Sequence, residues 1–390
     1  MDVMPGYKLT EVGVIPEEWR STSLGSEAEL LTGFPFPSAG FAASGVLLLR
    51  GSNVKRGQID WSEAITEHWP AVTSKIKKFE LREGDLVIAM DGALVGRSFA
   101  TIVHSDLPSL LVQRVARLRA RATEQQLLGA WLGSEEFVRH VDLVKTQTAI
   151  PHISPRDIRK FALAVPNGKA EQRAIAAALS DVDALLSGLT RLIAKKRDLK
   201  QAAMQQLLTG QTRLPSFRGE WVVKRLGDVL TVCHGKSQRD FEVADGPYPI
   251  LASGGQIGTA SRALCDQPSV LIGRKGTINQ PRYMDTPFWT VDTLFYTALM
   301  GDNSALYFYY RFCLIDWMQY NEASGVPSLN ARTIENIEVE CPDPAEQTAI
   351  ASILSDMDAE LAALEARRAK THALKQAMMQ ELLTGRTRLL

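Results

Sequence analysis

The sequence has few of the residues that bind metals or form disulfides. Its four cysteines, Cys233, Cys265, Cys313 and Cys341, all lie in the second half, and none belongs to a CxxC pair. The six histidines stand singly along the chain. Structural zinc sites and disulfide frameworks need such residues at close, regular spacing. We therefore expect no metal site and free thiols, as in proteins of the reducing cytoplasm.

Long apolar runs and an excess of either charge are also missing. No stretch approaches the roughly 18 apolar residues of a membrane-spanning helix, and residues 1–16 lack the apolar core of a signal peptide. Lysine and arginine together number 44, equal to aspartate and glutamate together. The net charge therefore neither favours nor excludes a nucleic-acid partner. A cytoplasmic protein without a membrane partner is expected.

Motifs of catalysis and of nucleotide binding are absent from the sequence. The GKS segment at 235–237 resembles the end of a phosphate-binding loop, but Leu230 stands where that loop needs its first glycine. The sequence contains no GxGxxG, HExxH or GxSxG, and no Asn/Asp-Pro-Pro-aromatic tetrapeptide of amino-methyltransferases. We predict that this chain has no catalytic residue and binds no cofactor.

A long segment of the chain occurs twice. Residues 171–214 return as 346–389, and 27 of the 44 aligned positions are identical without a gap. In both copies apolar residues alternate at spacings of 4 and 3, which is typical of a coiled-coil seam. A helix of about 39 residues would be about 60 Å long, so we expect the two copies to pack as an antiparallel pair. The predicted seam residues are Ile175, Leu179, Val182, Leu186, Leu189, Ile350, Leu354, Met357, Leu361 and Leu364.

Residues at both ends of the repeat indicate where these helices begin and end. Asp343 and Pro344 suit the N-cap and first helical position, and Glu346 is placed to reach back to a free amide as in a capping box. Gly210 and Gly385 stand where a left-handed residue commonly ends a helix.

The segments before the two long helices share a frame and differ in content. Trp19 matches Trp221. A buried strand running into a turn is predicted within 46–53, with its counterpart within 248–255. A short β-branched strand ending at Gly92 is predicted within 84–97, and its counterpart within 268–281 ends at Gly276. Helices are expected within 124–144 and 303–320. The predicted fold is α+β: two mixed α/β domains separated by two long antiparallel coiled-coil helices, with an internal pseudo-twofold, near-circular repeat. Its parts are an N-terminal segment packing near the C-terminal helix (1–19), the first module (20–165), the first long helix (166–214), the second module (215–341) and the second long helix (342–390).

Basic and amide side chains gather on predicted turns of both modules. Arginine, lysine, asparagine and glutamine match the donors and acceptors of base edges and phosphates. Any one of them could equally be a solvated loop residue, but as sets they favour a nucleic-acid interface. The candidates are Arg50, Ser52, Asn53, Lys55, Arg56 and Arg97 in the first module, and Lys236, Gln238, Arg239, Arg274, Lys275, Asn279 and Arg282 in the second.

These motifs resemble those of a known family. The twice-repeated EQxAIAxxLSDxDA and LKQAxMQxLLTGxTRL, the entry GVIPEEW and the segment GRKGTINQPRYMDTPFWTVDTLFY look like the specificity subunit of Type I restriction-modification systems. The resemblance covers nearly the whole chain. It implies that the two modules are target recognition domains, each reading one half of an asymmetric bipartite site in double-stranded DNA.

The same resemblance implies partners. The long helices would act as a spacer and as docking platforms for two methyltransferase subunits, with restriction subunits joining the full complex. S-adenosylmethionine, ATP and Mg²⁺ would then be bound by those partners. Two alternatives remain open at this stage, a coiled-coil scaffold without DNA specificity and a self-contained methyltransferase or nuclease.

Overall fold

The computed structural model describes residues 4–389, which form two compact units. The first unit holds the described residues up to Leu189 together with those from Arg367 onward, and the second holds Thr190–Ala366. Each unit therefore combines one of the two modules with parts of both long helices. The units are described in turn below.

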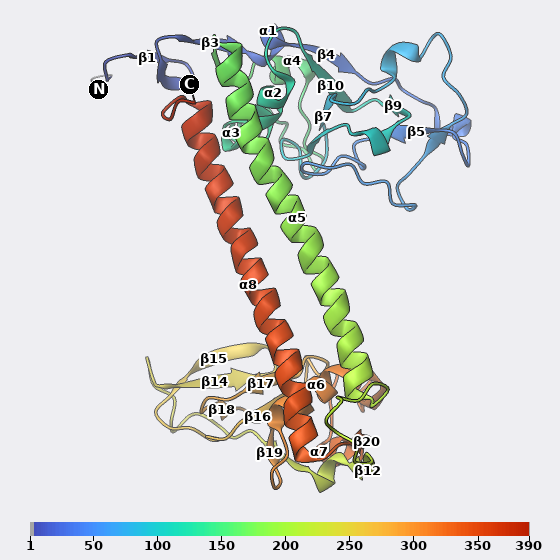
Figure 1. Ribbon diagram of the computed structural model, residues 1–390, viewed down its shortest axis with the longest axis vertical. Coiled ribbons are helices and arrows are strands. Elements are labelled where there is room, and N and C mark those ends of the chain that lie inside the picture. Colours follow the sequence, from blue (N-terminus) through green and yellow to red (C-terminus); the bar gives the residue numbers. More distant parts are fainter. Residues whose placement is uncertain (1–3, 390) are drawn as a thin grey trace. The chain divides into compact units, whose positions relative to one another are not determined.

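The two repeated segments form the long helices α5 (Lys169–Leu208) and α8 (Pro344–Leu383), each 40 residues long. In the first unit the start of α5 and the end of α8 share one apolar core, which contains Ile175, Leu179, Met379 and Leu382. In the second unit the end of α5 shares a core with the start of α8. The pairing is thus antiparallel, as predicted, and Figure 1 shows α5 in green and α8 in red.

The predicted seam is buried to different degrees along its length. The side chains nearest the modules are covered because they also contact module residues such as Trp19 in the first unit. Buried seam residues are Ile175, Leu179, Leu189, Ile350, Leu354 and Leu361, and half-buried ones are Val182, Leu186, Met357 and Leu364.

Ion pairs flank the seam in both units. In the second unit α5 supplies the cations, because Lys196, Arg197 and Lys200 pair with Glu360, Glu365 and Asp358 of α8. The first unit has the opposite arrangement. There Lys375 of α8 pairs with Asp183 of α5 at 2.6 Å.

The first module contains three sheets. The largest has the strand order β4 (Ala28–Thr32), β10 (Val115–Ala120), β7 (Leu86–Ala89) and β8 (Phe99–Thr101), all antiparallel. A second sheet places β5 (Val46–Leu49) between β6 (His68–Trp69) and the parallel β9 (Ser109–Leu111). The third pairs β3 (Trp19–Ser23) with β11 (Ala162–Pro166), next to the start of α5. The module helices are α1 (Leu24–Glu27), α2 (Gln125–Leu132), α3 (Glu135–Val144) and α4 (Pro155–Arg159).

The second module has the same three sheets in the same strand order. Its four-stranded sheet runs β13 (Leu230–His234), β19 (Leu294–Leu299), β16 (Ser269–Gly273), β17 (Arg282–Met284). The three-stranded sheet has β14 (Tyr248–Ala252) between β15 (Gly255–Ala260) and the parallel β18 (Trp289–Thr290). The pair is β12 (Val222–Arg225) with β20 (Glu338–Cys341). The module helices are α6 (Ala305–Leu314) and α7 (Ala331–Glu335).

A close approach of two backbones recurs in the two modules. A Cβ atom on Gly33 would overlap the carbonyl of Val112, and one on Gly235 would overlap the carbonyl of Val291. Only glycine fits at such a contact. Gly33, after β4, therefore lies where the chain crosses the segment that leads into β10. Gly235, after β13, lies at the corresponding crossing with the segment that leads into β19.

The predicted strands are present, and the predicted module helices are interrupted. The strand predicted to run into a turn within 46–53 ends at Leu49, before the turn at 51–53, and its counterpart within 248–255 ends at Ala252, before the turn at 253–254. The helix predicted within 124–144 is split into α2 and α3 by Gly133 and by Ser134, whose hydroxyl accepts the Phe137 N–H. In 303–320 the α-helix ends at Leu314, and a 3-10 turn follows at Trp317–Tyr320.

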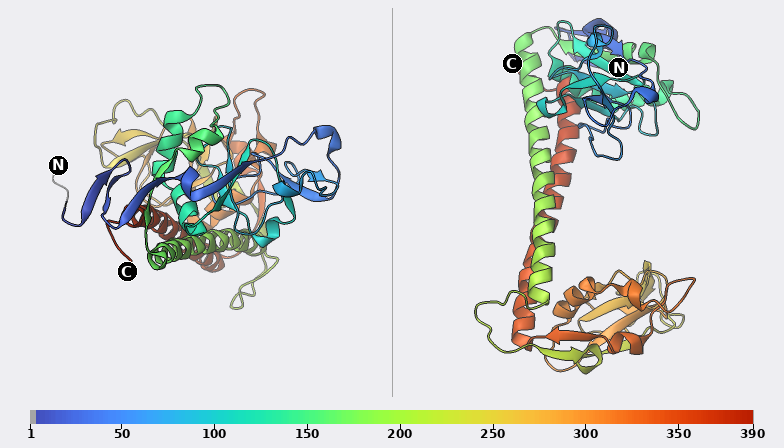
Figure 2. Two further views of the ribbon diagram at one scale, coloured as in Figure 1. Left: turned by 90° about the horizontal axis from the view of Figure 1, so that it is seen from above. Right: turned by 90° about the vertical axis from the view of Figure 1, so that its right-hand side faces the viewer.

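The N-terminal hairpin lies beside the end of α8 within the first unit. It consists of β1 (Tyr7–Thr10) and β2 (Gly13–Pro16). The Tyr7 hydroxyl donates a hydrogen bond of 3.1 Å to the carbonyl of Gly385, next to which Pro16 also packs. Figure 2 shows this hairpin in blue near the C-terminus. Among the helices of residues 4–389, none is long and apolar enough to cross a membrane.

Candidate nucleic-acid interface

The interface candidates lie on modules that are fixed to the long helices by two similar joints. We define the first joint as Trp19, Glu171 and Arg388, all in the first unit. The Arg388 guanidinium donates two hydrogen bonds to Glu171, at 2.5 and 3.0 Å, and the Trp19 indole N–H donates a third at 3.2 Å. The carboxylate is 7% exposed and its hydrogen bonds raise the pKa of Arg388.

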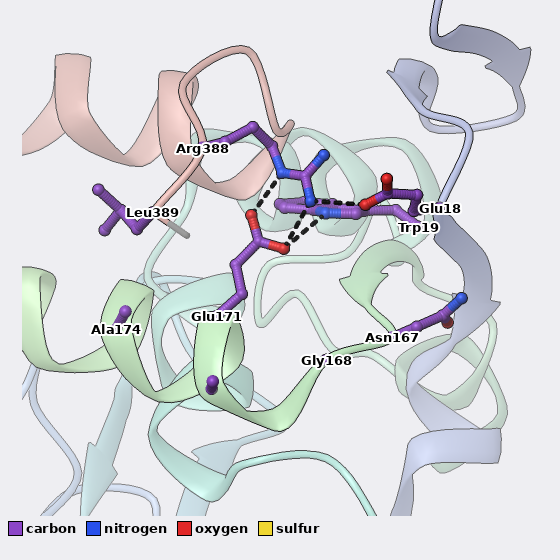
Figure 3. A pocket seen from close by; sticks show the side chains of 9 residues that line it. Glu18, Trp19, Asn167, Gly168, Glu171, Ala174, Arg388 and Leu389 are labelled. Atoms are coloured by element: carbon purple, nitrogen blue, oxygen red, sulfur yellow. Dashed lines mark hydrogen bonds and ion pairs between the residues drawn. The ribbon is translucent and has the colours of Figure 1, made fainter.

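This first joint closes one side of a pocket of about 620 Å³. Figure 3 shows the Arg388 guanidinium beside the Trp19 ring, with Glu18 and Glu171 turned toward it. Glu18 accepts a further hydrogen bond from Arg388 at 3.0 Å. The guanidinium is thus satisfied by protein carboxylates.

The second joint consists of Trp221, Glu346 and Arg213 in the second unit. Arg213 donates to both oxygens of Glu346, at 2.7 and 2.6 Å, and Trp221 donates at 3.1 Å. The prediction that Glu346 reaches back to cap its own helix was wrong in this respect, because these partners occupy its carboxylate. The cap itself is present, since the Asp343 carboxylate accepts the Glu346 N–H at 2.9 Å.

The glutamine that follows each of these glutamates links the helix start to its module. Gln172 accepts the Glu124 N–H just before α2 and donates to the Pro166 carbonyl. Gln347 likewise accepts the Ser304 N–H just before α6 and donates to the Pro342 carbonyl. Both glutamine side chains are buried, so each module has a fixed position on the helix end that follows it.

One of the predicted interface residues is used internally. The Asn53 side chain is fully buried, and its amide accepts the Arg50 N–H and donates to the carbonyls of Asp60 and Ile65. Its chemistry therefore shapes the turn after β5, and we do not retain it as a DNA contact. Arg50 is also largely occupied, since it donates to the Ile65 carbonyl at 2.6 Å.

The other basic residues predicted for the interface of the first module remain accessible. Arg56 and Arg97 are each a little under half exposed and pair loosely with Glu135 and Asp142 of α3, at 3.6 and 3.8 Å. Ion pairs of this kind are worth little, so both guanidiniums can exchange partners. Ser52 is exposed and Lys55 is half-buried. The backbone of Arg56 bridges Phe99, which places Arg56 close to Arg97.

In the second module the candidates lie on two turns. Lys236 and Arg239 are exposed and Gln238 is half-buried, in the segment that follows β13. The backbone of Lys236 is fixed by hydrogen bonds with Thr290 and with the indole of Trp289. Sequence reasoning missed Arg262, whose guanidinium stacks on the rings of Phe241 and Trp289 beside this turn.

The second of these turns lies between β16 and β17. Lys275 and Asn279 are exposed, and Arg274 is half-buried beside Asp292 at 3.9 Å. Arg282 donates to the Ser253 carbonyl at 2.9 Å, so the turn after β14 packs against it. These four candidates thus lie on one connection, from the end of β16 to the start of β17, whereas the Lys236 segment hydrogen-bonds to β18.

Sequence reasoning also missed Arg114, which precedes β10. It is exposed, has a left-handed φ of 69° and lies 4.0 Å from Asp91. The sequence feature that could have indicated it is an arginine in the short connection between two apolar segments. Arg114 faces the turn after β7, which corresponds to the turn at 274–275 of the second module, but the two segments are separate in the sequence.

The residues that could bind a metal ion are not clustered in the described part of the chain. No group of three or more His, Cys, Asp or Glu side chains in residues 4–389 is placed to hold a metal ion. The four cysteines are free thiols, and burial raises the pKa of Cys265 and Cys341.

Comparison with known proteins identifies relatives of the chain. Residues 218–372 match the family model of the Type I restriction modification DNA specificity domain. The EcoAI specificity subunit of Escherichia coli is 31% identical over 198 residues, which is 50% of this chain and 32% of that protein. The MjaVIII specificity subunit of Methanocaldococcus jannaschii is 27% identical over 215 residues, or 54% of this chain and 50% of that protein. The chain thus spans between a third and a half of these relatives.

Solved structures share the fold over nearly the whole length. The S subunit of a Type I restriction-modification system from M. genitalium matches with a TM-score of 0.67 and 16% identity, covering 97% of this chain and 98% of that one. A structure from a study of complex assembly in the type I system matches with a TM-score of 0.57 and 16% identity, over 95% and 99%. At this identity the likeness concerns the fold.

Proposed function

Since this chain is related to the specificity subunits of Type I restriction-modification systems, we propose that it selects the DNA sequence on which such a system acts. The observation that carries the proposal is a shared strand order in two modules whose exposed turns bear unlike side chains. In this role the chain is not an enzyme. Methylation and ATP-dependent cleavage belong to partner subunits, which bind S-adenosylmethionine, ATP and Mg²⁺.

Each module reads one half of a bipartite site in double-stranded DNA. Among the cations predicted from the sequence, Lys55, Arg56 and Arg97 of the first module are accessible, as are Lys236, Arg239, Lys275 and, half-buried, Arg274 and Arg282 of the second. Such side chains neutralise phosphates and contact base edges. Because the two sets differ, the two half-sites differ and the full site is asymmetric.

The long helices space the modules and bind two methyltransferase subunits, to which restriction subunits are added in the full complex. The two joints support this proposal, since each fixes a module to the start of one long helix and the segment that follows the other, by the same residue types. Equivalent surfaces at the two joints suit two copies of one partner. A protein with this role acts in the cytoplasm, where the DNA lies.

The test is a module exchange in the assembled complex. The full chain would be produced with the methyltransferase subunit of its own host, and methylated adenines would be mapped at single-base resolution. Replacing residues 215–341 by the corresponding module of a related chain should change one half of the methylated sequence and leave the other half intact. The matched control replaces the first module, 20–165, and should change only the opposite half.

Three outcomes would contradict the proposal. An unchanged methylation pattern after both exchanges would show that the modules do not read DNA. Absence of salt-dependent binding to duplex DNA by the complex would favour a scaffold without DNA specificity, since contacts to phosphates make affinity fall as salt rises. Adenine methylation by the isolated chain would point to the self-contained enzyme.

A further inference from the structure

The turn after β7 in the first module and the turn after β16 in the second have the same backbone frame. In the first module the Met90 N–H donates to the Arg114 carbonyl at 2.8 Å, and Gly92 N–H donates to the Pro151 carbonyl at 3.0 Å. In the second module Arg274 N–H donates to the Thr293 carbonyl at 2.9 Å, and Gly276 N–H to the Pro327 carbonyl at 2.8 Å. Each turn therefore lies between the connection that leads into β10 or β19 and a proline-containing loop.

In each module the turn and the connection that faces it carry opposite charges, and the signs are reversed between the two modules. The first module has Asp91 on the turn and Arg114 on the connection facing it. The second has Arg274 and Lys275 on the turn and Asp292 on the connection. The oppositely charged atoms are 4.0 Å apart in the first module and 3.9 Å apart in the second. The cation therefore lies on the connection in the first module and on the turn in the second.

Arg114 is exposed to solvent. Its side chain is 61% exposed, whereas that of Asp91 is 33% exposed. Its φ of 69° lies in the left-handed region, where glycine is the favoured residue and other residues are strained. Its ion pair is long and exposed, and such a pair adds little stability. Neither the fold nor the ion pair explains why an arginine stands at this position.

The neighbouring turn adds to the same surface. The Asp91 carboxylate lies against Gly51, in the turn after β5 that also carries Ser52 and Lys55. In the second module Gly276 lies correspondingly close to Ser253, in the turn after β14. Arg114 therefore belongs to the cluster of turns in which the candidate DNA contacts of the first module lie.

We infer that Arg114 is a DNA-contacting residue of the first module, in the role that Arg274 and Lys275 have in the second, and that the exchanged charges help to make the two half-sites unlike. This inference rests on the proposed function. Arginine can bind guanine O6 and N7, or a phosphate, through two donors at once. Asp91 lies beside the guanidinium, balances its charge in the free protein and orients it.

The test uses Arg114→Gly and Arg114→Ala in the full chain assembled with its methyltransferase subunit. Glycine suits the left-handed backbone, so Arg114→Gly should melt at the wild-type temperature or above it, and a loss of DNA binding cannot then be ascribed to unfolding. Affinity for a duplex carrying the mapped site should fall about 5- to 150-fold. A base contact would relax one position of the first module's half-site. A phosphate contact would weaken all sequences and reduce the salt slope by about one.

Arg121→Ala is the matched control. Arg121 is an exposed arginine that directly follows β10, whereas Arg114 directly precedes it, so the two lie at opposite ends of one strand. The control should bind and methylate like the wild type. Wild-type affinity and an unchanged methylation pattern in both Arg114 variants would overturn the inference alone. If the wild-type complex itself has no sequence preference, both the inference and the proposed function fail.

Discussion

Removing Arg388 should destabilise the first unit by about 2–3 kcal/mol. The Glu171 carboxylate is 7% exposed and would keep only the Trp19 N–H as a donor. Breaking a buried ion pair by deleting one partner costs about 3–5 kcal/mol, because the remaining charge stays buried. The Arg388 side chain is 21% exposed, so water can enter in its place and lower that cost. The residual loss is therefore about 2–3 kcal/mol.

The assay is thermal and urea unfolding of Arg388→Ala beside the wild type. For a domain of 150–250 residues, a loss of this size lowers the melting temperature by about 4–12 °C. Arg388→Lys should lose less than Arg388→Ala, because it keeps the charge but not the two-donor geometry. In a double-mutant cycle, Glu171→Gln with Arg388→Ala should cost less than the sum of the single changes, since the buried charge is gone.

The matched control is Arg386→Ala, two residues earlier in the chain. Arg386 forms a pair with Glu381 at 3.7 Å in which both side chains are about half exposed. Its removal should cost no more than about 0.5 kcal/mol. If Arg388→Ala and Arg386→Ala melt at the same temperature, or if the cycle is additive, the Glu171 carboxylate is not a buried charge that depends on Arg388.

Two further changes test the joints and the modules. Gln347→Ala should lower the free energy of unfolding by about 1–3 kcal/mol, measured in urea, because it removes a fully buried amide and leaves the half-buried Ser304 N–H without its acceptor. An unchanged midpoint would mean that water replaces the amide. Gly235→Ala should abolish cooperative unfolding of the second module, because the new methyl group would overlap a backbone carbonyl of the crossing strand. Gly254→Ala, at a glycine with open space around it, is its control and should unfold like the wild type. Wild-type melting of Gly235→Ala would contradict the close approach.

The long helices could be predicted because their signal is local and repeated. The seam positions recur at 4 and 3 residues over many turns, and the glycines after each copy mark the ends. Gly210 and Gly385 indeed adopt a positive φ, at 69° and 71°. The repeated pattern could not predict which side chains donate hydrogen bonds to Glu171 and Glu346. Glu346 has a suitable amide three residues before it, but Arg213 and Trp221, distant in sequence, offer a charged donor and a buried site.

The candidate interface could be predicted only as residue types on turns. Asn53 has the same side-chain chemistry whether it binds an adenine or closes its own turn, and only the fold shows that it is buried. Arg114 illustrates the converse. Its position opposite Asp91 depends on how the strands pair, and no periodicity along the chain reports that pairing. The remaining candidates stay predictions that the proposed DNA experiments will test.

The ion pairs beside the seam bear on which helices can associate when many copies of the chain are made together. In the second unit α5 contributes Lys196, Arg197 and Lys200, and α8 contributes the acids. Two α5 helices from different chains, paired antiparallel about this stretch, would place cations against cations. Each ion pair adds little to stability. Repulsion between like charges in an α5–α5 pair, however, lowers the stability of that pairing relative to α5 with α8. The charges therefore favour pairing of α5 with an α8 helix over pairing of α5 with a second α5.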